Sequence, residues 1–348
     1  GLIGNVNLQL LKDGRARTGI RGPEPLDDAV EVMRAFNVSP QNVMIADADG
    51  RIAWIIAGRL PRRVGHDGTV PISWAEEGIG WDGWLDESHR PVIIDPESGV
   101  LFSANNRMAD LETARVLGRE WAEPDRARRI SELLAGEELF DESALSAMQL
   151  DTALPGLQPL RERLLKVIPA DHASALARRA RQQVELWNGT ADADQRGLPI
   201  LLKVDRILQS DVLSTLLQDS YPNLSVPEGP LRRIVAAEPP EFLSSQFQSW
   251  DEAYTSAFER AVMDMQSQGS LDRDWGELNS SSFNHFAAEA FPWAGANLNL
   301  PVHPQAGHPS AIRVAHPRFG ASARLVVSPS HDASGILQTP GGQSGNYL

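Results

Sequence analysis

The sequence predicts an α+β protein, and the order of its patterns along the chain carries this prediction. A β-hairpin is expected at residues 42–58, and residues 109–266 have mostly helical periodicity. Strand patterns then return near the end of the chain, at 275–279, 312–315 and 322–328. Strands at both ends with helices inserted between them indicate an α+β architecture in which the two strand groups join one sheet system.

The first expected elements are a helix and the hairpin. Apolar side chains recur at helical spacing along residues 26–36, namely Leu26, Val30, Met33 and Phe36. In the hairpin, alternating apolar side chains lead into Asp49-Gly50 and out of it again. Because Asp-Gly readily adopts the positive φ values of a type I′ turn, we expect that turn here.

The segment after the hairpin is a long connection at 60–96 that is rich in Gly and Pro. It contains three tryptophans, Trp74, Trp81 and Trp84. A structureless loop of this length inside a compact domain is unusual unless it has a functional or packing role. Aromatic packing that pins the loop is the favoured interpretation, and carbohydrate stacking is the alternative.

The helical region follows a strand expected at 99–104, which places Asn105-Asn106 just beyond its end. Asp125 is the expected N-cap of a helix over 126–134. Further helices are expected at 141–150, from Pro155 to about Val167, and at 171–187, 198–218 and 240–266. The chain thus divides into sheet and long loop at about 42–105, helices at about 109–266 and returning strands at about 271–348.

Composition limits the classes of function. The 348 residues include 42% hydrophobic and 22% charged side chains, which is typical of a globular protein. A net charge of −14 argues against a nucleic-acid surface. No apolar run approaches the ~18 residues of a membrane span. The absence of cysteine excludes disulfides and a cysteine nucleophile, and the start at Gly1 and end at Leu348 suggest a piece of a longer product.

Two short motifs that could bind a metal fail on spacing. Residues 47–50 (Asp-Ala-Asp-Gly) are similar to a calcium loop, but the glycine comes too early and no glutamate completes the motif. His303 and His308 lie in a proline-rich stretch rather than on one helix face, which argues against a zinc site.

Residues 41–107 closely resemble the nucleophile-bearing subunit of the penicillin acylase family, and the similarity continues almost to the end of the chain. After the hairpin and the Asn pair, short motifs follow in the family's order. These motifs are Pro124-Asp125-Arg126-Ala127-Arg128-Arg129-Ile130, Met148-Gln149-Leu150-Asp151, Leu186-Trp187-Asn188-Gly189, Trp275-Gly276-Glu277-Leu278, Phe319-Gly320-Ala321-Ser322-Ala323-Arg324 and Gly341-Gly342-Gln343-Ser344-Gly345. Each motif alone is weak, and their order along most of the chain makes the resemblance strong.

The resemblance implies an αββα N-terminal-nucleophile hydrolase fold with a large helical insertion. Such proteins are precursors that cut themselves to expose a serine, whose own amino group serves as general base. By resemblance, Asn105 is the side-chain donor to the oxyanion, and a backbone N–H that precedes this chain is the second donor. Arg126 matches an arginine that arranges charge near the nucleophile. The alternatives are an Asn that only shapes the loop and a surface arginine paired with Asp125 or Glu123.

The resemblance also bears on metals and partners. Calcium commonly bridges the two subunits in this family, and the carbonyl of Gly68 matches one ligand. The family's carboxylate ligand does not align cleanly: Asp110 or Glu112 is near, but Arg115 and Val116 stand about where it belongs. No organic cofactor is expected. The expected partners are the smaller subunit of the same precursor and an N-acyl small molecule, in a periplasmic or secreted location.

The expected function is hydrolysis of the amide of an N-acyl compound, of the penicillin or cephalosporin side-chain type or of the acyl-homoserine lactone type. The nucleophilic serine is expected outside this chain, since Gly1 has no side chain, so the chain alone is expected to be inactive. One alternative is a degenerate homologue that acts as a non-catalytic binding or scaffolding protein. Another is a glycan-binding module lined by Trp81 and Trp84.

Overall fold

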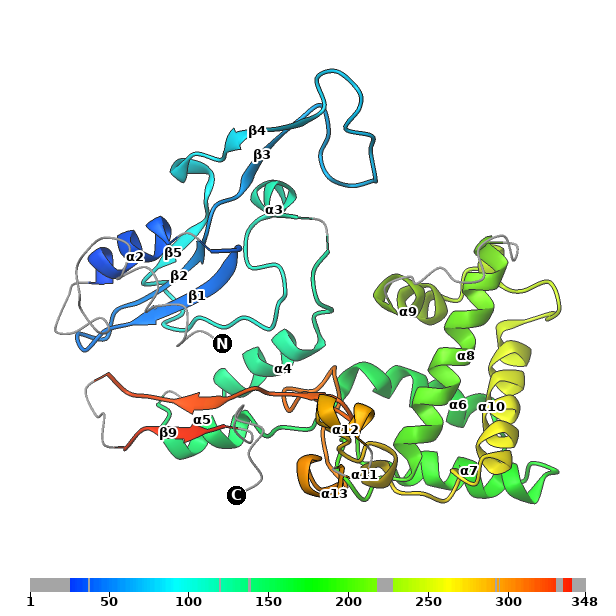
Figure 1. The fold of residues 1–348 in the computed structure, drawn as a ribbon. Helices are drawn as coiled ribbons and strands as arrows, with labels where there is room; N and C mark the ends of the chain where they lie inside the picture. Colours follow the sequence, from blue (N-terminus) through cyan, green and yellow to red (C-terminus); the bar gives the residue numbers. More distant parts are fainter. Residues whose placement is uncertain are drawn as a thin grey trace. The chain divides into compact units, whose positions relative to one another are not determined.

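The computed structural model describes residues 26–36, 38–118, 120–136, 139–217, 228–291, 293, 295–329 and 334–339. The glycine-rich motif at 341–345 lies outside these residues. The chain divides into two compact units, one of residues 1–146 and 322–340 and one of residues 147–321 and 341–348. The described part mixes α and β structure, mostly helical with small sheets, which confirms the α+β prediction (Figure 1).

A three-stranded antiparallel sheet lies in the first unit. In order, its strands are β1 (Gln41–Ala46), β2 (Ile52–Ala57) and β5 (Val92–Ile94). Helix α2 (Leu26–Ala35) packs its apolar stripe against Ala53 and Ile55, as its spacing predicts. Trp54 and Ile56 are buried on the opposite face. Because β2 is covered on both faces, its sequence is a continuous apolar run rather than an alternation.

The turn between β1 and β2 differs from the expected type I′ turn. The loop spans residues 47–51, and Gly50 has φ 83°. Asp49 does not have a positive φ. A type I′ turn needs positive φ at both of its central residues, so this turn is of another type. Asp47 organises the loop instead, because its Oδ1 accepts hydrogen bonds from the amides of Asp49 and Arg51, each at 3.0 Å.

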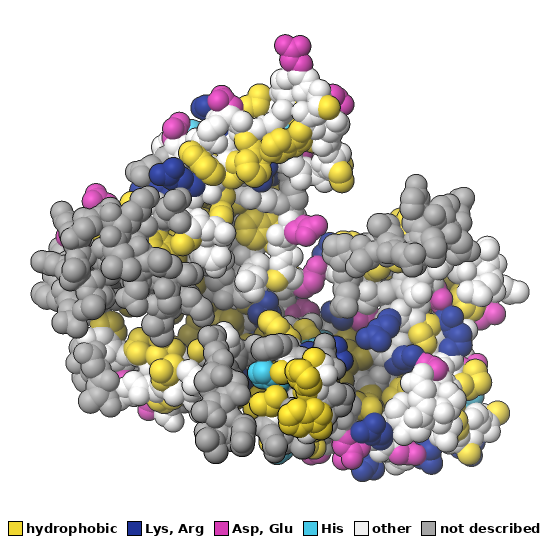
Figure 2. Space-filling view, in the orientation of Figure 1, with side chains coloured by type: hydrophobic (Ala, Val, Ile, Leu, Met, Phe, Trp, Pro, Cys, Tyr) yellow, Lys and Arg dark blue, Asp and Glu magenta, His cyan; other side chains and the backbone are white. Residues whose placement is uncertain are grey.

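A second hairpin occupies much of the connection that was expected to lack structure. Strands β3 (Pro61–Val64) and β4 (Gly80–Trp84) pair antiparallel, and a 3-10 helix covers Glu87–His89. Trp74 and Trp81 pack edge to face, with ring centroids 5.3 Å apart, yet they stay 57% and 56% exposed. Figure 2 shows hydrophobic side chains gathered over this hairpin. The sequence did not predict these strands, because Gly and Pro interrupt the alternation of apolar and polar side chains along them.

The prediction of a strand at residues 99–104 is wrong. These residues have no regular secondary structure, since no described strand forms a ladder with them. The rest of the first unit consists of α3 (Leu111–Leu117), α4 (Asp125–Leu134), α5 (Glu142–Met148), which ends past the unit's boundary, and the pair β8 (Arg324–Val326) and β9 (Ile336–Gln338). Asp125 is the first residue of α4 rather than its N-cap, a position that Pro124 takes.

Helices dominate the second unit. They are α6 (Gln158–Val167), α7 (Ala175–Leu186), α8 (Gly197–Leu217), α9 (Glu228–Ala237) and α10 (Trp250–Ser267), with 3-10 turns at Pro155–Leu157 and Pro240–Phe242. Helix α8 lies in the middle of their shared core, with Leu198, Ile200 and Leu201 fully buried. The helix predicted at 240–266 begins late, because Ser249 caps α10 by accepting from Glu252 N at 3.2 Å.

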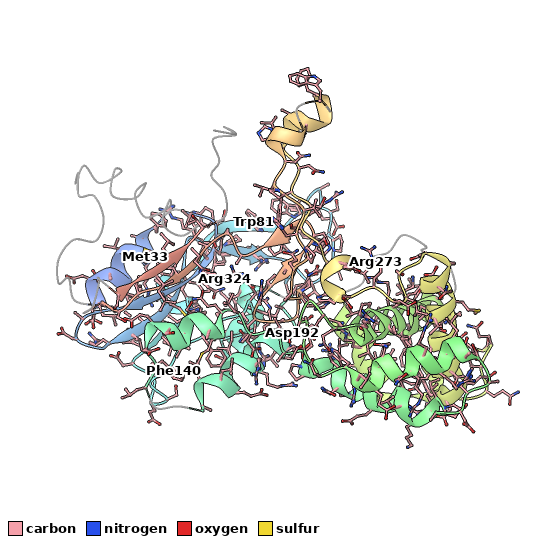
Figure 3. The ribbon with its side chains drawn as sticks, turned by 90° about the horizontal axis from the view of Figure 1, so that it is seen from below. Met33, Trp81, Phe140, Asp192, Arg273 and Arg324 are labelled. Carbon is pink, nitrogen blue, oxygen red and sulfur yellow. The ribbon has the colours of Figure 1, made fainter. Side chains whose placement is uncertain are left out.

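The loop before α8 is held by polar contacts. Trp187 is buried and donates its Nε1–H to the carbonyl of Thr190 at 2.7 Å. Asp192, labelled in Figure 3, accepts hydrogen bonds from the hydroxyls of Thr152 and Thr190 at 2.6 Å and 2.7 Å. These contacts fasten the loop to the segment that precedes α6.

The strand predicted at 275–279 is instead a short helix, α11 (Trp275–Leu278). Its first amides bond to the loop before α8, with Trp275 N to Gln195 O at 2.8 Å and Gly276 N to Ala193 O at 2.7 Å. A Cβ on Gly276 would lie 2.7 Å from that of Ala193, so only glycine fits this approach. Tertiary contacts therefore override the strand propensity.

The other late elements are short. They are α12 (Phe286–Ala290), α13 (Gly295–Leu298), β6 (Ala315–His316) and β7 (Phe319–Gly320). The strands predicted at 312–315 and 322–328 thus shrink to two and three residues. In the part of the chain that the structure describes, the strands form four separate sheets rather than one. No helix in that part has the length and apolar character needed to cross a membrane.

Candidate active site

Asn105 lies on a turn with an unusual backbone conformation. Its φ is 65°, in the left-handed region that Asn tolerates better than most residues. Asn106 shapes the turn by accepting a hydrogen bond from Ala104 N at its Oδ1, at 2.9 Å. The carbonyl of Asn105 accepts from the amide of Ala122 at 3.0 Å, which ties the turn to the segment before α4. The backbone thus favours Asn, Asp or Gly at position 105 for structural reasons alone.

Arg126 contacts this turn from the first turn of α4. Its Nη2 donates to Ala104 O at 2.8 Å and to Asn105 Oδ1 at 3.1 Å. A guanidinium has only donors, so the atom of the Asn105 amide that faces it is the oxygen. The amide nitrogen Nδ2 lies at the other end of the exposed side chain and bonds to no described residue. Arg126 therefore determines which way the donor group of Asn105 points.

The charge environment of Arg126 differs from that of an ordinary surface arginine. The side chain is partly buried, and this burial lowers the pKa of its guanidinium. It forms no ion pair with a described carboxylate, so the alternative pairing with Asp125 or Glu123 is wrong. A half-buried cation without a counter-ion creates a positive potential at its site.

Two main-chain groups of this site could not be predicted from the sequence. The carbonyl of Ala104 accepts from Arg126, and the amide of Ala122 donates to Asn105. Backbone groups carry no residue-type signal, so nothing in the sequence marks them. The structure brings together the two predicted catalytic residues, Asn105 and Arg126, through these anchors.

The surroundings of Gly68 do not fit a calcium ion by themselves. Gly68 has φ 78°, and a Cβ there would lie 2.9 Å from Arg63 Nε. Arg63 also donates its Nη1 to the carbonyl of Val116 at 3.0 Å, where the family's carboxylate was expected. A guanidinium beside this loop disfavours a divalent cation. The described residues contain no group of three or more His, Asp or Glu side chains that could hold a metal, so calcium bound by ligands elsewhere stays a prediction.

The two histidines rejected as zinc ligands both lie in the second unit. His303 pairs with Ser281 through main-chain and hydroxyl groups. His308 accepts a hydrogen bond at Nδ1 from Ser310 N at 3.1 Å. Burial, helped by nearby Arg232 and His316, lowers the pKa of His308 to about 4. His308 is therefore neutral at pH 7, with its proton on Nε2.

Comparison with known proteins relates the chain to acylases. The penicillin amidase family model matches residues 24–348. Penicillin acylase 2 proenzyme from Pseudomonas sp. strain SE83 is 28% identical over 301 residues, covering 83% of this chain and 38% of that protein. The acyl-homoserine lactone acylase QuiP from Pseudomonas syringae pv. syringae strain B728a is 25% identical over 372 aligned positions, covering 92% of this chain and 44% of that protein.

The chain spans less than half the length of these two relatives. Among solved structures, the thermostable penicillin G acylase from Alcaligenes faecalis aligns with a TM-score of 0.54 at 17% identity, covering 79% of this chain and 54% of that one. That likeness shows a shared fold. Because the family model covers nearly all of its residues, the chain belongs to the penicillin amidase family.

Proposed function

We propose that the protein containing this chain hydrolyses the amide bond of an N-acyl small molecule. Family membership supports this proposal, as do the names of the relatives, which are acylases of penicillin or of acyl-homoserine lactones. We assign the described elements to an αββα N-terminal-nucleophile fold with a helical insertion, and the likeness to penicillin G acylase supports the assignment. The smaller subunit of the same precursor is the proposed partner.

The proposed reaction uses a serine at the amino terminus of the mature subunit, outside this chain. Its α-amino group, with an ordinary pKa near ~8, takes the hydroxyl proton as the oxygen attacks the amide carbonyl. The carbonyl π electrons move to oxygen and form a tetrahedral oxyanion. The protonated amine then gives its proton to the leaving nitrogen as the carbonyl re-forms and the C–N bond breaks, which leaves the acyl group esterified to the serine. Water, deprotonated by the same amine, attacks this ester, and the serine oxygen leaves and takes the proton back.

Asn105 donates to that oxyanion in this proposal. The observation that carries the assignment is the 3.1 Å hydrogen bond from Arg126 Nη2 to Asn105 Oδ1. It orients the amide before any substrate arrives, so no reorganisation is needed during the reaction. A cationic donor on the oxygen also polarises the amide and strengthens its N–H as a donor. Arg126 thus acts as a positioning residue.

The test uses substitutions that keep the backbone of position 105. Asn105→Ala is a poor choice, because φ 65° costs about 1–2 kcal/mol for a residue that, unlike Asn, Asp or Gly, does not tolerate the left-handed region. Asn105→Asp accepts this conformation and can pair with Arg126, but it replaces the donor with a negative charge. In the complete processed enzyme we expect kcat for an N-acyl p-nitroanilide to fall by at least ~10²–10³-fold, with the melting temperature unchanged or raised.

The matched control is Asn106→Asp. Asn106 serves the turn as an acceptor from Ala104 N, and Asp keeps that acceptor. We therefore expect this variant to stay within about threefold of the wild-type kcat. Equal losses of kcat from the two substitutions would show that Asn105 is not the oxyanion donor. An Asn105→Asp enzyme that keeps more than a tenth of the wild-type kcat would show the same.

The chain by itself is expected to be inactive in this proposal, because the nucleophile lies outside it. Incubation of the purified chain with a chromogenic phenylacetyl amide should give no release of chromophore. Turnover by this chain alone would contradict the external serine. A complete coding sequence that contains no serine at a processing site would instead favour the non-catalytic binding protein.

A further inference from the structure

A cavity of about 590 Å³ lies in the second unit. Its walls come from α8, α9, α11, the end of α10 and the segment 308–317. All of its lining residues belong to the second unit, whereas Asn105 and Arg126 belong to the first. The volume falls within the range of small-molecule sites.

Positive charge predominates in the lining. Lys203, Arg206 and Arg232 face the cavity, and Asp205 is the one carboxylate among its lining residues. Asp205 is buried and pairs with Arg232 at 2.9 Å, and Lys203 pairs with Asp264. Figure 2 shows several Lys and Arg side chains around α8, next to Asp and Glu side chains. In a protein of net charge −14, a cationic cavity is a local exception that attracts anions.

Arg206 and Gln209 are two polar side chains of the lining that take no part in this network. Neither of them has an ion pair or hydrogen bond with a described residue. Gln209 is 7% exposed, yet its amide atoms are not among the described side-chain atoms that are buried without a hydrogen-bond partner, so they keep contact with solvent in the cavity. The two residues are three positions apart on α8 and thus lie on the same face of the helix.

The remaining wall is apolar or neutral. Met265, Trp275 and Leu278 contribute apolar surface, and Trp275 has its Nε1–H already bonded to Gly307 O at 2.9 Å. His308 packs beside Trp275, with ring centroids 5.9 Å apart, and carries no charge at pH 7. An occupant therefore needs one anionic end and an apolar body.

We propose that this cavity binds a small carboxylic acid with an apolar chain or ring. The Arg206 guanidinium pairs with the carboxylate, for which its planar fork is suited. The Gln209 amide donates a second hydrogen bond, and Trp275 and Leu278 pack against the apolar body. One unpaired cation matches one negative charge, which favours a carboxylate over a phosphate. This inference does not depend on the catalytic role of Asn105.

The test is isothermal titration of the protein with three probes: octanoate, its neutral amide octanamide and inorganic phosphate. We expect octanoate to bind at least about tenfold more tightly than either of the others, because only octanoate supplies both the charge and the apolar chain. Equal affinity for octanamide would overturn the anion site. Equal affinity for phosphate would overturn the apolar part of the proposal.

Variants locate the binding. Arg206→Gln and Gln209→Leu should each weaken octanoate binding by about tenfold. Gln209→Leu should not lower the melting temperature without ligand, since Gln209 makes no hydrogen bond to a described residue. Arg233→Gln is the matched control, an exposed arginine of α9 outside the lining. Unchanged affinity in Arg206→Gln, or an equal loss in Arg233→Gln, would overturn the proposal.

Discussion

Asn105 lies on an irregular turn of the first unit, whereas the cavity of the second unit is built against a continuous hydrophobic core. The turn depends on a few polar contacts, and the Asn105 side chain is exposed. The cavity is bounded by α8, which lies among the most buried residues of the protein. Polar contacts between distant residues thus position the first site, and packing positions the second. Substitutions at Asn105 should accordingly change activity with little change in stability, whereas truncation of core side chains in the second unit should lower stability.

The largest effect on stability is expected in the core of the second unit. Phe258 on α10 is 1% exposed, and Phe258→Ala should lower the free energy of unfolding by about 3–5 kcal/mol. Met263→Ala on the same helix is the control, since Met263 is 61% exposed and should cost less than ~0.5 kcal/mol. Chemical denaturation measures both. Similar losses would mean that packing does not define this unit.

The second prediction concerns the pH dependence of stability around His308. Its pKa is lowered from 6.5 to about 4, so the native state favours the neutral ring. The stabilisation is therefore fully present above pH 6.5 and is lost as the pH falls toward 4. His308→Asn keeps an acceptor for Ser310 N but cannot titrate. The wild type should lose up to about 3 kcal/mol relative to this variant over that window.

His89→Asn in the first unit is the control substitution for His308→Asn. His89 is exposed, and only the adjacent Ser88 contacts its ring among the described hydrogen bonds. Melting curves between pH 4 and pH 7 should separate from wild type for His308→Asn alone. Parallel curves for both variants would show that His308 is not held neutral by its surroundings.

The third prediction tests how Arg126 acts. Arg126→Met removes the donor to Asn105 Oδ1, a bond to a charged group worth about 1.5–3 kcal/mol, so kcat should fall about tenfold or more. The matched control is Arg128→Met, since Arg128 is an exposed arginine of the same helix. In an Asn105→Gly background, Arg126→Met should have little further effect, because its target is gone. Additive losses would show that Arg126 acts by another route.

The smallest effects are expected on the β3–β4 hairpin. Trp81 is half exposed and contacts Trp74 at its edge, so Trp81→Ala should cost no more than about 1.5 kcal/mol. Neither Trp81→Ala nor Trp84→Ala should change migration in a polysaccharide-containing gel. Retardation that these substitutions abolish would favour the glycan-binding alternative and give the first unit a second site.

The helices could largely be predicted from the sequence, and the candidate site could be predicted only in part. Helices α2 and α8 follow their apolar spacing because each of them packs its apolar side chains into the core of its own unit. The short helix α11 could not be predicted, since its amides bond to Gln195 and Ala193 far along the chain. The contact between Asn105 and Arg126 joins residues 21 positions apart. Family resemblance alone suggested both residues, and no local pattern could pair them.

The most direct test of the Asn105 assignment compares two inhibitors of the complete processed enzyme. A boronic acid forms a tetrahedral anion on the serine and so imitates the transition state, whereas the carboxylic acid of the same chain imitates the ground state. We predict that Asn105→Gly lowers the affinity for the boronic acid by about 100-fold and the affinity for the carboxylic acid by no more than about threefold. Equal weakening of the two inhibitors, or no weakening of the boronic acid, would contradict the account.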